Sequence, residues 1–261
     1  MKKLVISFVI AAGLPALMMA QGGRGGRGAA PPANPKADAR EDLTGYWVSV
    51  VTEDYRWRMI TPLKGDAASI PINNEGRKIV DAWDPAKDEA AGQQCRSYGA
   101  AAVMRVPGRL HITWDDDNTL KIETDAGTQT RVLHFGAQPP ADLKPSWQGF
   151  STARWEPGLP PGPPGAPLGM MTRAGARSRS LEVHTSGLLL GYLRKNGVPY
   201  SDSATVTEYY DQFNEPSGQP WFTVTTIVTD PKYLAVPYVT TTDFKKEADG
   251  SKWNPTPCTS R

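Results

Sequence analysis

The chain has 261 residues, with 29 lysines and arginines against 27 aspartates and glutamates, which gives a formal net charge of +2. Charges of both signs are mixed along the sequence, and no basic run with interleaved aromatic residues occurs. A single-sign electrostatic field is therefore excluded, and we expect no nucleic-acid partner.

Residues 1–20 have the layout of a secretory signal peptide. Lys2 and Lys3 precede an apolar run from Leu4 to Leu14, and small or apolar residues lead to Ala20. The run is shorter than the ~20 residues that span a bilayer. We therefore predict cleavage and export to the periplasm or the medium, with no stable membrane insertion afterwards.

Residues 21–41 are rich in glycine, proline and arginine and lack the large apolar side chains that would offset the cost of ordering the chain. This segment is predicted to be a disordered linker. Residues 42–261 have the size of one β domain, interrupted by a Pro- and Gly-rich loop insertion at 157–177. Export to an oxidising compartment predicts that the two cysteines, Cys95 and Cys258, form a disulfide.

The clearest strands lie in residues 104–135. Leu110, Ile112 and Trp114 alternate with polar residues, and Leu120 and Ile122 do the same, so these side chains should face a core. Turn residues at 107–108, 116–118 and 125–127 separate the strands, which predicts an antiparallel meander. Further strand-like runs occupy residues 46–52, 55–60, 147–155, 180–185, 205–213, 221–229 and 236–244.

Helical spacing occurs with confidence only near residues 74–93, where Asp84-Pro85 predicts a helix start and Gly92 a helix end. The remainder predicts an all-β fold, an antiparallel up-and-down β-barrel that is lipocalin-like and has about 8 to 10 strands. Closure of the sheet is favoured because it leaves no exposed edge.

Two resemblances support this expectation. Gly45-Tyr46-Trp47 resembles the G-x-W signature of lipocalins and other calycins, which implies that Trp47 closes one end of a barrel. Residues 95–244 resemble an uncharacterised family of secreted bacterial proteins. The resemblance lies in Trp147-Gln148-Gly149-Phe150-Ser151, Leu181-Glu182-Val183, Val206-Thr207-Glu208 and Asp230-Pro231-Lys232-Tyr233. It implies the fold and export, and it implies no catalytic residue.

Three histidines are available as metal ligands. Alternation with apolar neighbours turns His111 and His184 outward, so we expect neither a metal site nor another cofactor. His134, in phase with Val132, is predicted to face inward. Glu208 is either an ordinary surface residue or, if it faces the core, a candidate acid or base with His134 as its partner and an arginine as its counter-charge.

The leading hypothesis is a secreted barrel that binds a small apolar or aromatic molecule. The candidate ligand-binding residues are Trp114, Trp147, Trp155, Tyr209 and Arg131. One alternative is a hydrolase, lyase or isomerase that uses Glu208 and His134 in the barrel cavity. The other is an envelope or carbohydrate-binding module that presents exposed tryptophans.

Overall fold

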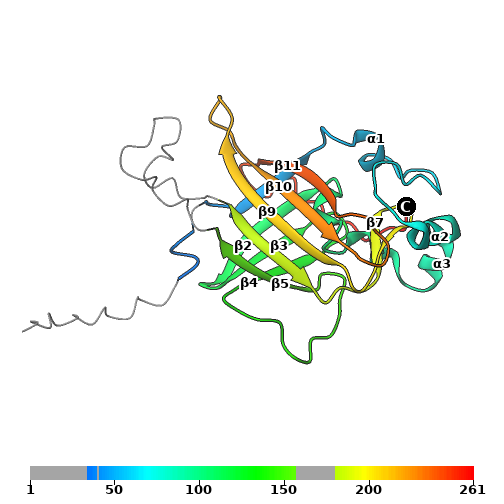
Figure 1. Ribbon diagram of the computed structural model, residues 1–261. Coiled ribbons are helices and arrows are strands. Elements are labelled where there is room, and N and C mark those ends of the chain that lie inside the picture. Colours follow the sequence, from blue (N-terminus) through cyan, green and yellow to red (C-terminus); the bar gives the residue numbers. More distant parts are fainter. Residues whose placement is uncertain (1–33, 40, 157–179) are drawn as a thin grey trace, which may run out of the picture. The chain divides into compact units, whose positions relative to one another are not determined.

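In the computed structural model, which describes residues 34–39, 41–156 and 180–261, nine strands close into a barrel (Figure 1). In their order around the barrel they are β1 (Gly45–Val50), β11 (Tyr238–Lys246), β10 (Pro220–Thr229), β9 (Thr205–Asn214), β6 (Leu181–Ser186), β5 (Phe150–Trp155), β4 (Thr130–Phe135), β3 (Thr119–Thr124) and β2 (Arg109–Asp116). The predicted all-β barrel is confirmed. The predicted signal peptide at 1–20 and the loop at 157–177 lie outside the described residues.

One pair of neighbouring strands departs from the expected antiparallel arrangement. β4 and β5 run parallel, with Leu133 opposite Ser151, whereas the other neighbours around the barrel are antiparallel. A ring with an odd number of strands cannot alternate in direction all the way round, so at least one pair must be parallel. The connection at residues 136–149 returns the chain to the end where β4 began.

The alternation of residues in the meander gives the correct faces. Leu110, Ile112, Leu120 and Ile122 are buried inside the barrel, and Ile112 lies opposite Ile122 in the β2–β3 register. The polar residues between them are half-buried on the outer wall. The period-2 pattern therefore fixed both the strand register and the side of the sheet that is dry.

Large side chains occupy the barrel interior. They include Trp47, Tyr210, Phe222 and Phe244, and Trp47 packs edge-on against Phe222 with ring centroids 4.6 Å apart. The Trp47 indole nitrogen donates a hydrogen bond to the Leu43 carbonyl oxygen at 2.9 Å. A packed aromatic and aliphatic core thus stands where the sequence suggested a ligand cavity.

The helical segments are short. They are α1 (Tyr55–Arg58), α2 (Asn74–Ala82), α3 (Pro85–Ala90) and the 3₁₀ turns η1 (Gln94–Tyr98) and η2 (Val103–Arg105). Asn73 and Asp84 cap α2 and α3 with their side chains, and the chain turns at Gly92 with φ of +66°, so the predicted helical insertion is confirmed. No helix among the described residues is long and apolar enough to span a bilayer.

The strand predicted at residues 55–60 is wrong, because this segment forms the single turn α1. Asp54 adopts a left-handed conformation with φ of 54°, and its carbonyl oxygen accepts hydrogen bonds from the amides of Trp57 and Arg58. Polar and apolar residues alternate in this short segment as they would in a strand. The alternation pattern alone therefore does not distinguish a single helical turn from a strand.

A second apolar cluster lies at one end of the barrel. A hairpin of β7 (Gly191–Arg194) and β8 (Val198–Tyr200) packs with α2 against barrel residues such as Val206 and Val228. Figure 1 shows α1, α2, α3 and β7 gathered beside this end. The helices and the hairpin thus surround this end of the barrel, which the barrel strands alone do not enclose.

Residues 34–39, which fall within the predicted linker at 21–41, make ordered contacts with the barrel, while residues 21–33 lie outside the described residues. The Lys36 amide donates to the Asp117 carbonyl oxygen at 3.1 Å, and the Trp155 indole nitrogen donates to the Pro35 carbonyl oxygen at 2.9 Å. Hydrogen bonds to the turn between β2 and β3 and to β5 therefore order a segment that has no large apolar side chain of its own.

Candidate functional site

A cavity of about 420 Å³ lies between the barrel end and the segments around it. Its lining comes from four separate stretches, 57–61, 97–107, 193–195 and 256–259, together with Ala126. The volume falls in the range of small-molecule sites, which is roughly 300 to 1,000 Å³. Segments far apart in the sequence thus meet around one space that can hold a ligand.

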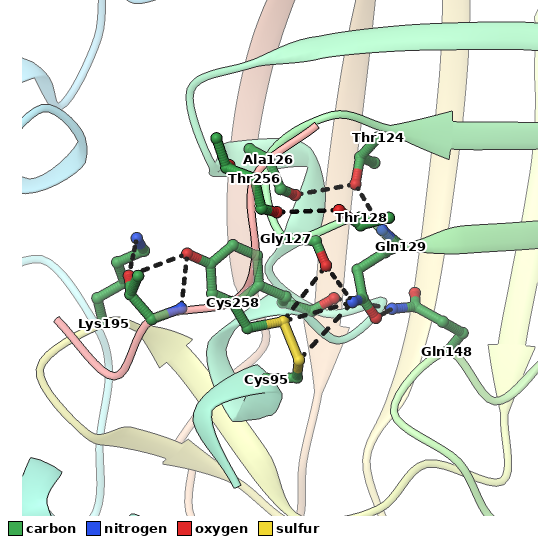
Figure 2. Close-up of a disulfide and its surroundings, with 12 residues drawn as sticks. Cys95, Thr124, Ala126, Gly127, Thr128, Gln129, Gln148, Lys195, Thr256 and Cys258 are labelled. Atoms are coloured by element: carbon green, nitrogen blue, oxygen red, sulfur yellow. Dashed lines mark hydrogen bonds between the residues drawn. A yellow bond between two sulfur atoms is a disulfide. The ribbon is translucent and has the colours of Figure 1, made fainter. Parts of the chain in front are cut away.

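The predicted disulfide holds one wall of this cavity. Cys95 and Cys258 are joined across 163 positions of sequence, with their Cα atoms 5.1 Å apart. Figure 2 shows the bond beside Gln129, whose amide nitrogen donates to the Gly127 carbonyl oxygen at 2.6 Å. The bond ties the C-terminal segment, including the lining residues Thr256 and Thr259, to η1.

Backbone contacts reinforce the same wall. The Thr256 amide donates to the Asp125 carbonyl oxygen at 2.8 Å, and the Thr128 hydroxyl donates to the Thr256 carbonyl oxygen at 2.9 Å. Gly127 has φ of +79° and lies directly against the ring of Tyr98, so a side chain at this position would collide with that ring. The close approach places the Tyr98 ring at the cavity.

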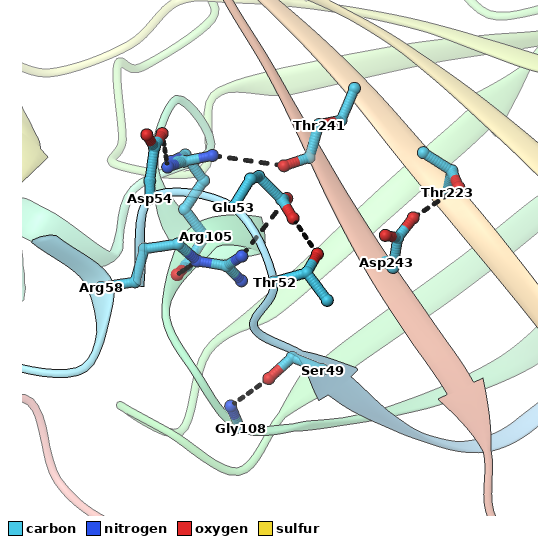
Figure 3. A network of polar contacts seen from close by, with 10 residues as sticks. All are labelled: Ser49, Thr52, Glu53, Asp54, Arg58, Arg105, Gly108, Thr223, Thr241 and Asp243. Atoms are coloured by element: carbon cyan, nitrogen blue, oxygen red, sulfur yellow. Dashed lines mark hydrogen bonds and ion pairs between the residues drawn. The ribbon is translucent and has the colours of Figure 1, made fainter. Parts of the chain in front are cut away.

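Two arginines form the wall opposite, in the network drawn in Figure 3. Arg105 Nη2 lies 2.5 Å from Asp54 Oδ2, and its Nη1 donates to the Thr241 carbonyl oxygen. Arg58 Nε donates to the Arg105 carbonyl oxygen at 3.0 Å, and its Nη1 lies 3.4 Å from Glu53 Oε1. Burial and the charge of Arg105 lower the pKa of Arg58 to about 10.

A third arginine, Arg194, lines the cavity at the end of β7 and is 6% exposed. Its guanidinium lies over the Trp57 ring, 4.6 Å from the ring centroid. Neither Nη1 nor Nη2 has a hydrogen-bond partner among the described residues. Burial lowers the pKa of this guanidinium, which the Tyr238 hydroxyl and the more distant Asp54 partly oppose.

The structure brings two of the predicted site residues together inside the barrel. Arg131 and Glu208 are 1% and 0% exposed and form a bidentate pair, with Nη1–Oε1 at 2.9 Å and Nη2–Oε2 at 2.5 Å. Burial opposes the charge on Arg131, but Glu208 and Tyr210 raise its pKa above the ordinary value. The Ser151 and Thr185 hydroxyls, 2.7 Å apart, complete a buried polar group.

The predicted acid–base pair of Glu208 and His134 does not form. Along β4 the buried residues are Arg131, Leu133 and Phe135, so the half-buried His134 lies on the outer face, stacked on Phe150 at 4.6 Å. Both faces of β4 carry apolar residues, so its alternation does not show which face is inward. The larger residues, Leu133 and Phe135, face the core, and Val132 faces outward with His134. The inward prediction for His134 is therefore wrong, and the two side chains lie on opposite faces of the wall.

The predicted aromatic ligand-binding residues are dispersed. Trp114 and Trp155 flank Phe135 at the edge of the barrel core, and Tyr209 lies on the outer face of β9. Trp147 is half-buried before β5, where its carbonyl oxygen accepts the Ala100 amide. None of them, nor Arg131, lines the cavity.

The alternative of a carbohydrate platform needs exposed indoles. All eight tryptophans lie within the described residues: Trp47 and Trp83 are buried, and the other six are half-buried. This argues against a flat sugar-binding surface built from tryptophan. Among the described residues, no cluster of three or more histidine, cysteine or acidic side chains is placed to hold a metal ion.

Sequence reasoning missed the cavity residues. Arg58 and Arg105 each interrupt an apolar or aromatic run, as in Trp57-Arg58-Met59 and Met104-Arg105-Val106, and Arg194 directly follows the apolar pair Tyr192-Leu193. An arginine inside an apolar run was the available signal, because a buried guanidinium needs a specific reason to be there.

No protein-family model, curated protein or solved structure matches this chain significantly. The function therefore has to be argued from the geometry of the cavity.

Proposed function

We propose that the protein is an exported binding protein for a small molecule with a flat apolar or aromatic body. The ligand site is the cavity beside the barrel end, and the barrel interior is the scaffold that supports it. The observation that carries the proposal is the half-open cavity of about 420 Å³ with the rings of Trp57 and Tyr98 in its lining. Apolar side chains, including Met59, Ile60 and Leu193, provide further area that a ring system would cover.

The way the walls are held also supports binding. The disulfide fixes the C-terminal wall and the ion pairs of Arg58 and Arg105 fix the wall opposite, so little of the site needs to be ordered when a ligand enters. A preformed site loses less conformational entropy on binding, which favours affinity for a ligand of modest size. The resemblance to secreted bacterial proteins and to lipocalins remains a prediction.

The test uses phenyl naphthylamine, an uncharged aromatic dye whose fluorescence rises in apolar surroundings. We expect saturable binding of one dye per chain to the purified mature protein. Thr256→Trp should weaken binding, because Thr256 is exposed at the cavity lining and a larger ring there fills space without displacing the core. The matched control is Val236→Trp, which adds the same ring at an exposed position that does not line the cavity. Equal dye binding by both variants would overturn the proposed site.

Export belongs to the same proposal. The Cys95–Cys258 disulfide fits an oxidising compartment, in agreement with the signal-peptide pattern of residues 1–20. We expect the protein from an expressing bacterium to leave the cytoplasm and to begin at Gln21. N-terminal sequencing of the fractionated protein checks this, and a cytoplasmic protein that retains residues 1–20 would contradict it.

A further inference from the structure

The charges around the cavity are one-sided. Four cationic side chains line it, namely Arg58, Arg105, Arg194 and Lys195, and no aspartate or glutamate does. Over the whole chain the two signs are nearly balanced, with 29 basic and 27 acidic residues. A cleft lined by charges of one sign produces a potential that attracts the opposite charge.

Two of these cations are paired with carboxylates that do not line the cavity. Asp54 pairs with Arg105 and Glu53 pairs with Arg58, yet neither carboxylate lines the cavity. Lys195 Nζ donates to the Thr259 hydroxyl at 3.1 Å and lies 4.9 Å from the Tyr98 ring centroid, without a carboxylate in ion-pair contact. The carboxylates that orient Arg58 and Arg105 thus lie outside the cavity lining, whereas Lys195 is held by two lining residues.

Arg194 differs from the other buried arginines of the described residues. Arg105 and Arg131 each contact a carboxylate, whereas Arg194 makes no ion pair there and both of its terminal nitrogens lack a hydrogen-bond partner. A buried guanidinium nitrogen without a hydrogen-bond partner is costly, so the two terminal nitrogens of Arg194 are suited to bind an acidic group that enters the cavity. The stacking of Arg194 on Trp57 places that charge beside an aromatic wall of the cavity.

We propose that the ligand is an organic anion, a carboxylate or sulfonate on a flat apolar body, and that Arg194 is the residue that selects for its charge. This rests on the proposed function and states the ligand class of the same cavity. The apolar body covers Trp57 and Tyr98, while the acidic group accepts hydrogen bonds from the two Arg194 nitrogens that have no partner among the described residues.

The experiment compares two dyes with the same ring body. Anilinonaphthalene sulfonate is anionic, and phenyl naphthylamine is uncharged, so their affinities for the mature protein separate the charge from the ring system. We expect the anionic dye to bind at least about tenfold more tightly, and this preference to fall as salt is added. Arg194→Met should weaken the anionic dye by about tenfold or more and change the neutral dye by no more than about twofold.

Two further variants serve as controls for the charge and for the position of Arg194. Arg194→Lys retains the charge and should keep most of the preference for the anion. Arg154→Met is the matched control, because it removes an exposed cation on the outer wall of β5, which pairs with Glu182 away from the cavity. It should leave both dyes unchanged.

The outcomes are distinguishable. Binding of the neutral dye with no preference for the anion, or an Arg194→Met variant that keeps the preference, overturns the anion proposal and leaves the binding function standing. Binding of neither dye overturns both.

Discussion

Two arginines are almost fully buried, Arg131 in the barrel interior and Arg194 beside the cavity. Of the two, only Arg131 has a carboxylate within ion-pair distance among the described residues. Arg131 contacts both carboxylate oxygens of Glu208 and the hydroxyls around them, so its charge is compensated within the barrel. Arg194 lies on the ring of Trp57 with two terminal nitrogens unpaired. The comparison separates a charge that the barrel interior compensates from a charge that, in our proposal, a ligand compensates.

The largest expected effect comes from breaking the interior pair. Arg131→Met leaves the Glu208 carboxylate buried without a partner and should lower the free energy of unfolding by about 3 to 5 kcal/mol. The double variant Arg131→Met/Glu208→Met removes both charges and should recover much of that loss. Urea unfolding followed by circular dichroism measures both, and a single variant that costs less than about 1 kcal/mol would contradict the assigned role.

Removal of the disulfide comes next. Cys95→Ser with Cys258→Ser should cost about 2 to 4 kcal/mol, because the bond closes a long loop in the unfolded chain. It should also weaken dye binding, since Thr256 and Thr259 are then held only by hydrogen bonds. Unfolding and titration of the same variant test both effects. A variant that loses stability and binds normally would show that the wall does not depend on the bond.

Arg194→Met sharpens the comparison directly. Because it removes a buried charge that makes no ion pair with the described residues, it should leave the free energy of unfolding within about 1 kcal/mol of the parent or raise it. The lost contact with Trp57 limits any gain. A loss as large as that of Arg131→Met would show that Arg194 has a structural partner and would remove the contrast between the two sites.

The smallest effect concerns alkaline pH. Burial raises the pKa of Tyr200, and burial is also the main cause that raises the pKa of Tyr192 to about 12. The unfolded chain releases these protons near pH 10 while the folded chain retains them, so this contribution is fully present below pH 10 and is lost as the pH rises toward 12. Tyr200→Phe should be nearly neutral at pH 7, because its hydroxyl has no hydrogen-bond partner, and should flatten the decline above pH 10. Urea unfolding at pH 8 to 11 checks the slope.

The parts of the fold that were predictable have local causes. The hairpin of β2 and β3 follows from alternation and from the aspartates and Asn118 at its turn, and α3 follows from Asp84-Pro85 at its start and Gly92 after its end. The inward face of β4 was not predictable in this way. Its two phases are both apolar, and the inward position of Arg131 depends on Glu208, which is 77 residues away.

The candidate site shows the same limit. The disulfide was predictable because only two cysteines exist, but the sequence does not indicate that it closes one wall of a cavity. Arg58, Arg105 and Arg194 lie in three separate segments, and only their contacts in space show that two have carboxylate partners and one does not.

By itself, the amino-acid sequence determined the β class, the helical insertion and the disulfide, because each depends on residue spacing or on a count of one residue type. Only the tertiary structure decided that the barrel is packed with side chains, that His134 faces outward, and that the cationic cavity lies at the barrel end. Those features depend on which distant segments meet, and burial and electrostatic pairing are set by neighbours in space.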